Sequence, residues 1–163
     1  MKCLLLAFAF ALAACGGPAA PPTTPAPEKL APVPEKLLVL VDDQGVGLGG
    51  HDPVSYTKGP PAAGVADQTS DHGGARYRFV SAEDKTAFDG DKATFAPGFG
   101  GYCAFAAAQN RLSAADPKVF VIHEGHLLVF TNEDYKTRFA ADPKGNTAKA
   151  DANWPGLVAK HGK

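Results

Sequence analysis

The sequence predicts a small α+β domain behind a targeting segment and a linker. Two apolar runs, 119–123 and 126–130, flank Glu124-Gly125, which is the pattern of a short antiparallel hairpin with a two-residue turn. Helix-start residues precede short helical patterns at 81 and at 132. After the linker about 125 residues remain, enough for one domain with a modest core. We therefore expect one short antiparallel sheet and packed helices.

Residues 1–14 have the features of a signal peptide. Lys2 is positively charged, and the apolar run 4–14 is shorter than the roughly 20 residues that span a bilayer. Leu12-Ala13-Ala14-Cys15 looks like a lipobox, so we expect cleavage before Cys15 and lipid on its sulfur. We therefore expect this lipid to anchor the chain to a membrane, which is then its partner, on the periplasmic side of the cell envelope. Gly16-Gly17 favours the outer membrane.

Residues 15–36 comprise this cysteine and a linker rich in proline and alanine, which is typical of an extended spacer. We expect the domain to span 37–163. The net charge is −1 and there is no block of basic residues, so we expect no nucleic-acid partner. We find no internal repeat in the sequence.

The first part of the domain begins with the apolar run 37–41, which predicts a buried strand. Residues 45–50 match GxGxxG, but Pro53 follows where a dinucleotide site needs a helix. We therefore expect a flexible turn at these glycines. The composition of 59–73 predicts a loop, and the alternation over 75–80 predicts a half-buried strand.

The remaining helices follow from capping patterns and periodicity. Ser81 with Asp84 resembles a capping box and predicts a helix through 88. A short helix is expected over 104–109, after a glycine-rich turn. A third begins at 132 and continues to 140, and 145–160 forms a weakly amphipathic tail in which Trp154 docks on the core.

Cys103 is the most informative residue for function. Cys3 is removed with the signal peptide and Cys15 carries lipid, so Cys103 is the one thiol left in an oxidising compartment. Such a thiol is either buried and inert or reserved for metal or redox chemistry. Its expected place at a helix N-terminus favours the thiolate.

Three segments resemble the YHS-domain family, specifically its exported stand-alone members. They are Gly49 to Tyr56 (GGHDPVSY), Phe95 to Ala104 (FAPGFGGYCA) and Ala148 to Pro155 (AKADANWP). The resemblance implies a small α+β domain, distantly similar to metal-binding modules attached to heavy-metal pumps. It also implies that some relatives carry selenocysteine at the position of Cys103, which suggests redox use.

The chain departs from the metal-binding members of that family. They carry cysteines where this chain has Ser55 and Val80, so a site of several thiolates is not available. His51 stands where the exported branch usually has tyrosine.

These observations leave three functions open. The first is a binding module for copper or another transition metal, with Cys103 as the main ligand and His51 and Asp52 as helpers. The second is a thiol redox protein centred on Cys103. The third is a non-catalytic interaction module of the envelope. Hydrolase motifs are missing from the sequence, and the resemblance implies no particular enzymatic activity, so whether the chain is an enzyme stays open. His123 and His126, paired across the hairpin turn, are a further candidate metal pair.

Overall fold

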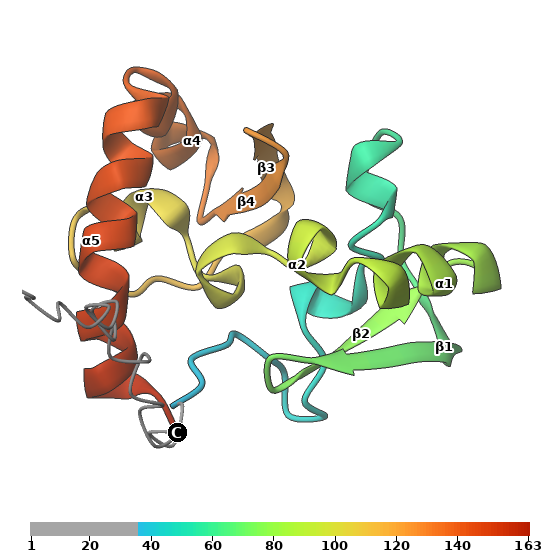
Figure 1. Cartoon of the computed structure of the whole chain (residues 1–163). Coiled ribbons are helices and arrows are strands. Elements are labelled where there is room, and N and C mark those ends of the chain that lie inside the picture. The colour runs from blue at the N-terminus through green and yellow to red at the C-terminus, as the bar shows by residue number, and fades with distance from the viewer. Residues whose placement is uncertain (1–35) are drawn as a thin grey trace, which may run out of the picture. The chain divides into compact units, whose positions relative to one another are not determined.

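The described part of the chain contains two β-hairpins, each followed by helices (Figure 1). The computed structural model describes residues 36–163, which lie in one unit, Pro34–Lys163. The expected signal peptide and Cys15 lie outside the described residues. The first hairpin and its helices are β1 (Val65–His72), β2 (Ala75–Phe79), α1 (Ala82–Gly90) and α2 (Lys92–Phe95). The second set is α3 (Ala104–Ala108), β3 (Asp116–His123), β4 (His126–Phe130), α4 (Glu133–Ala140) and α5 (Pro143–His161). The α+β class is as predicted.

The two halves repeat the same structure at an offset of 51 residues. Strands β1 and β3 begin at 65 and 116, β2 and β4 at 75 and 126, and α1 and α4 at 82 and 133. The irregularity in strand pairing also recurs, between Val65 and Thr69 in β1 and between Asp116 and Phe120 in β3. The fold is therefore a tandem duplication of a hairpin–helix unit.

The duplication corrects our expectation that the chain has no repeat. From 47 to 91, 11 of 45 residues are identical to those 51 positions later, including the glycines of GxGG and a Lys-Thr-x-Phe segment. Most of these identities lie at turns and at single buried positions. Because hydrophobic positions retain their character and not their identity, the repeat is weak in sequence and plain in structure.

The glycine-rich turns before each hairpin have matching backbones. Leu48, Gly49 and Gly50 have φ of 52°, 56° and 79°, and the residues of the second turn have 51°, 57° and 79°. These turns form the short 3₁₀ segments Leu48–Gly50 and Gly98–Gly101. Glycine adopts positive φ without a steric penalty, so the GG pair is needed in both repeats.

The second hairpin and both helix starts are confirmed. The turn residues Glu124 and Gly125 have φ of 50° and 84°, as a tight two-residue turn requires. Ser81 caps α1 by accepting a hydrogen bond from the Asp84 N–H at 3.1 Å. Asn132 caps α4 in the same way, by accepting a hydrogen bond from the Tyr135 N–H at 2.9 Å.

Two predictions of secondary structure were wrong. Residues 65–72 form β1 where we expected a loop, since the half-buried strand β2 pairs with this polar segment in a hairpin. Residues 37–41 form no strand beyond one bridge, Val41 with Gly47. Instead, the Leu40 N–H donates a hydrogen bond to the Gly100 carbonyl at 2.8 Å. Leu37 and Lys163 exchange two backbone hydrogen bonds.

The core joins the two repeats. Buried residues of the first repeat, among them Tyr77, Phe79 and Phe88, pack with Leu127 and Val129 of the second. Tyr56 donates a hydrogen bond to the Pro117 carbonyl at 2.9 Å, which also crosses between the repeats. A second cluster lies between α3, α4 and the β3–β4 hairpin, and a third between α3 and α5.

Helix α5 is the main departure from the repeat. Its counterpart α2 ends at Phe95, whereas α5 continues to His161 and lies beside α3 (Figure 1). Asn153 fixes this packing by donating to the carbonyls of Ala107 and Ala108 at 3.0 and 3.2 Å. No helix within residues 36–163 is long and apolar enough to cross a membrane.

Candidate functional site

Cys103 is buried in the second core cluster. It lies at the N-cap of α3, as expected, with 0% of its surface exposed and no side-chain capping bond. Its neighbours are apolar and include Phe130 and Phe139. A reagent or metal ion in solvent reaches such a thiol only when this packing opens. The observed environment is that of a small hydrophobic side chain.

The two expected helper residues, His51 and Asp52, are engaged in local structure. The His51 ring contacts the Leu48 carbonyl through Nδ1 at 3.0 Å. Asp52 is fully buried, and its carboxyl accepts the backbone N–H groups of Val54 and Val80 at 2.8 and 2.9 Å. Among residues 36–163, no group of three or more His, Cys, Asp or Glu side chains could hold a metal ion. A metal site at Cys103 thus stays a prediction.

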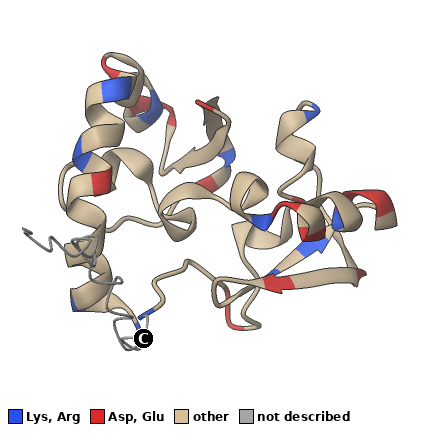
Figure 2. Cartoon of the chain, viewed as in Figure 1, with Lys and Arg blue, Asp and Glu red and all other residues tan. Residues whose placement is uncertain are grey.

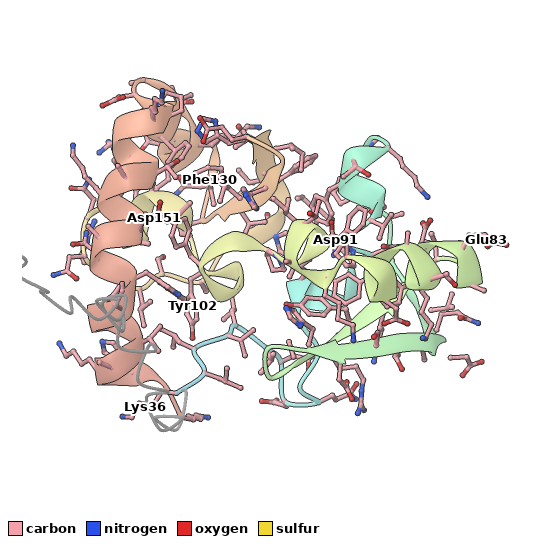
Figure 3. The ribbon with its side chains drawn as sticks, viewed as in Figure 1. Lys36, Glu83, Asp91, Tyr102, Phe130 and Asp151 are labelled. Carbon is pink, nitrogen blue, oxygen red and sulfur yellow. The ribbon has the colours of Figure 1, made fainter. Side chains whose placement is uncertain are left out.

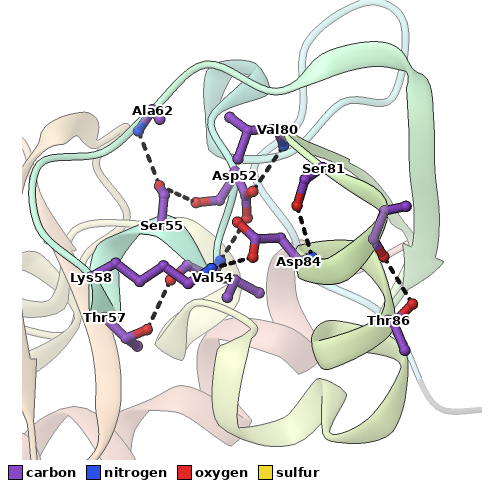
Figure 4. Close-up of polar contacts among 11 residues, drawn as sticks. Asp52, Val54, Ser55, Thr57, Lys58, Ala62, Val80, Ser81, Asp84 and Thr86 are labelled. Carbon is purple, nitrogen blue, oxygen red and sulfur yellow. Dashed lines mark hydrogen bonds and ion pairs between the residues drawn. The ribbon is translucent and has the colours of Figure 1, made fainter.

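A pair of buried carboxyls joins the Asp-Pro-Val turn to α1 (Figure 4). Burial raises the pKa of Asp52, and the side chain and charge of Asp84 raise it further, although the two N–H donors oppose this. Lys58 forms an ion pair with Asp84. The sequence showed no such pair, because its members are 32 residues apart and come together only through the fold.

The duplication explains why both Asp52 and Cys103 are buried. The two residues are equivalent, 51 positions apart. The Asp52 N–H donates to the Ala62 carbonyl at 2.9 Å, and the Cys103 N–H donates to the Ser113 carbonyl at 3.0 Å. One repeat fills this inner position with a carboxyl group and the other with a thiol. The position is therefore part of the repeat's framework.

A concave site with several polar side chains lies between the β3–β4 hairpin and α5. This cleft has a volume of about 400 Å³. Helix α5 contributes one face at i, i+4 and i+7 spacing, and the hairpin turn and the second glycine-rich turn supply the rest. Its principal lining residues are Phe99, His123, Glu124, His126, Thr147, Asp151 and Trp154.

His123 and His126 are direct cross-strand partners, as the hairpin pattern predicted. The His123 ring packs edge-on against Phe139, with centroids 6.1 Å apart, and the equivalent His72 packs the same way on Phe88 at 6.2 Å. His123 therefore has a packing role common to both repeats. His126 has no such counterpart, since the equivalent residue is Ala75.

Two polar atoms of the cleft residues have no hydrogen-bond partner among the described residues. They are His123 Nε2 and Thr147 Oγ1, and both are shielded from solvent. An unpaired buried polar atom costs about 1–3 kcal/mol. Since solvent reaches neither atom, neither is part of the open surface of the cleft.

The cleft is acidic and aromatic. Glu124 and Asp151 contribute carboxylates and no Lys or Arg lines it, although both charges are interspersed elsewhere on the described chain (Figure 2). Asp151 lies on α5 on the side of the hairpin (Figure 3). Trp154 packs edge-to-face on Phe99 with ring centroids 5.6 Å apart. Trp154 thus docks the helix, as expected, and also lines the cleft.

Sequence reasoning missed this cleft as a whole. It identified His123, His126 and Trp154 separately but did not connect them. The i, i+4, i+7 spacing of Thr147, Asp151 and Trp154 was the available signal. Comparison with protein-family models, with curated proteins and with solved structures gave no match. The resemblance to the YHS family therefore rests on the three quoted segments.

Proposed function

We propose that this chain is a non-catalytic binding module, anchored in the cell envelope through Cys15, whose ligand occupies the cleft between the β3–β4 hairpin and α5. The observation that carries the proposal is a concave site of about 400 Å³ that combines an aromatic wall with the polar side chains of Glu124, His126 and Asp151. Ligand sites in proteins combine an apolar wall with a few such polar groups.

The alternatives centred on Cys103 have less support. Transition-metal binding, with copper as the leading candidate, needs a second ligand near a thiol whose neighbours are apolar. Thiol redox chemistry needs an exposed thiol, and Cys103 has 0% exposure. Both remain predictions, and the experiment below tests the metal site.

The test uses Trp154, the sole tryptophan of the sequence, as a reporter inside the cleft. The full-length chain is titrated with small cationic, neutral and anionic compounds, and in the absence of oxygen with Cu(I) and Zn(II). Trp154 fluorescence and isothermal titration calorimetry measure the binding. We expect saturable binding that changes Trp154 emission, survives Cys103→Ala and weakens at least tenfold in Asp151→Arg. Asp67→Arg, an exposed aspartate on β1, is the matched control.

Three outcomes separate the candidates. Binding that Asp151→Arg weakens and Cys103→Ala leaves intact supports the cleft. Metal binding that is lost in Cys103→Ala and unchanged in Asp151→Arg moves the function to the thiol. Absence of saturable binding across the whole panel contradicts the binding-module proposal.

A further inference from the structure

We infer that the cleft selects a small organic cation, an amine with an apolar body, over neutral and anionic molecules of the same shape. This inference rests on the proposed function and names its ligand class. The first support is charge. Glu124 and Asp151 both line the cleft, and no Lys or Arg among residues 36–163 lines it to compensate them. Both carboxylates are exposed, so they attract a cation at the rim without having lost their own hydration.

The aromatic wall suits the same ligand. Trp154 and Phe99 form one side of the cleft and are half-buried. Aromatic rings attract an adjacent organic cation through their negative faces, and they also bury its apolar body. The volume of about 400 Å³ lies at the lower end of small-molecule sites.

The two carboxylates fit an ammonium group. An ionised carboxylate accepts hydrogen bonds and donates none. Glu124 and Asp151 are thus able to receive N–H donors and to balance the charge of the ligand. An anion would place acceptors against two carboxylates.

The duplication indicates that this cleft is specific to the second repeat. In the first repeat α2 ends at Phe95, so the wall that α5 supplies through Thr147, Asp151 and Trp154 has no counterpart. Ala75 also replaces His126 there. A bare metal ion suits the cleft less well, since no three potential ligands within residues 36–163 are grouped around one point.

The experiment compares three probes of one shape: benzylamine, benzyl alcohol and benzoate. Each is titrated at pH 8, where ordinary imidazoles are neutral, into the full-length chain, and Trp154 emission and binding heat are recorded. We expect benzylamine to bind at least tenfold more tightly than the other two. Asp151→Asn should remove most of that preference and leave benzyl alcohol binding unchanged. Asp67→Asn should change neither.

The failures of the inference and of the proposed function are distinguishable. Equal binding of benzylamine and benzyl alcohol overturns cation selection and leaves a binding cleft. Binding of Cu(II) or Zn(II) alone, lost in His126→Ala, also overturns the organic cation and retains the cleft as a metal site. Failure of all three probes and of both metals overturns the inference together with the proposed function.

Discussion

Asp52 and Cys103 occupy equivalent inner positions, and their chemistry differs because their surroundings differ. Asp52 has two backbone N–H donors and the neighbouring Asp84, whereas Cys103 lies among apolar side chains. A carboxyl that is buried beside another carboxyl resists ionisation. The first repeat therefore carries a proton-dependent contact that the second repeat lacks.

Replacing Asp52 with asparagine should change how stability depends on pH. The pKa of Asp52 is raised in the folded chain, so its contribution to the free energy of unfolding is full below its unfolded pKa and is lost as pH rises through the folded pKa. An asparagine amide stays neutral throughout this range. The variant should therefore gain stability relative to wild type between pH 3 and pH 8, by about 1.4 kcal/mol per unit of raised pKa.

Urea denaturation at the two pH values measures this difference. The exposed Asp67→Asn is the control, and its stability relative to wild type should be nearly constant. A constant difference for Asp52→Asn as well would show that Asp52 ionises normally in the folded chain.

At the scale of elements, the two glycine-rich turns share a backbone but have different neighbours. A Cβ on Gly49 would meet only the Pro117 side chain at 3.3 Å and the His51 ring at 3.9 Å. A Cβ on Gly100 would lie 2.1 Å from the Leu38 carbonyl oxygen, which belongs to the segment that leads from the linker. The second turn is thus also the place where the start of the domain is attached.

The pair Gly49→Ala and Gly100→Ala should separate backbone strain from this attachment. Both substitutions place alanine at φ near +57°, which costs on the order of 1 kcal/mol. Gly100→Ala must also displace the Leu38 backbone and break the Leu40–Gly100 hydrogen bond, so we expect it to lose about 2 kcal/mol more. Thermal unfolding measured by far-UV circular dichroism compares the two. Equal losses would show that residues 38–40 contribute nothing to stability.

At the scale of the whole molecule, neither repeat has a complete core. Leu127 and Val129 of the second repeat fill the core of the first, and Tyr56 of the first contacts Phe120 and Pro117 of the second. A unit of about 60 residues buries too little surface to be more than marginally stable alone. The duplication therefore produced one cooperative domain.

Unfolding should accordingly be a single transition. Trp154 fluorescence reports the second repeat and far-UV circular dichroism reports both, and we expect the two urea midpoints to agree within error. As a complement, the isolated segment 36–96 should have no cooperative transition. Two separated midpoints, or a folded isolated segment, would contradict the shared core.

The local features of this protein follow from short stretches of its sequence. Helix caps at Ser81 and Asn132, the Glu124-Gly125 turn and the helix after Cys103 depend on neighbouring residues, so their patterns could be read directly. The burial of Cys103, the Asp52–Asp84 pair and the cleft were decided by tertiary structure, because each depends on residues distant in the chain. β1 escaped sequence reasoning for the same reason, since its polar residues form a strand only against β2. The repeat was not recognised in the sequence, because packing conserves shape and polarity while residue identities change.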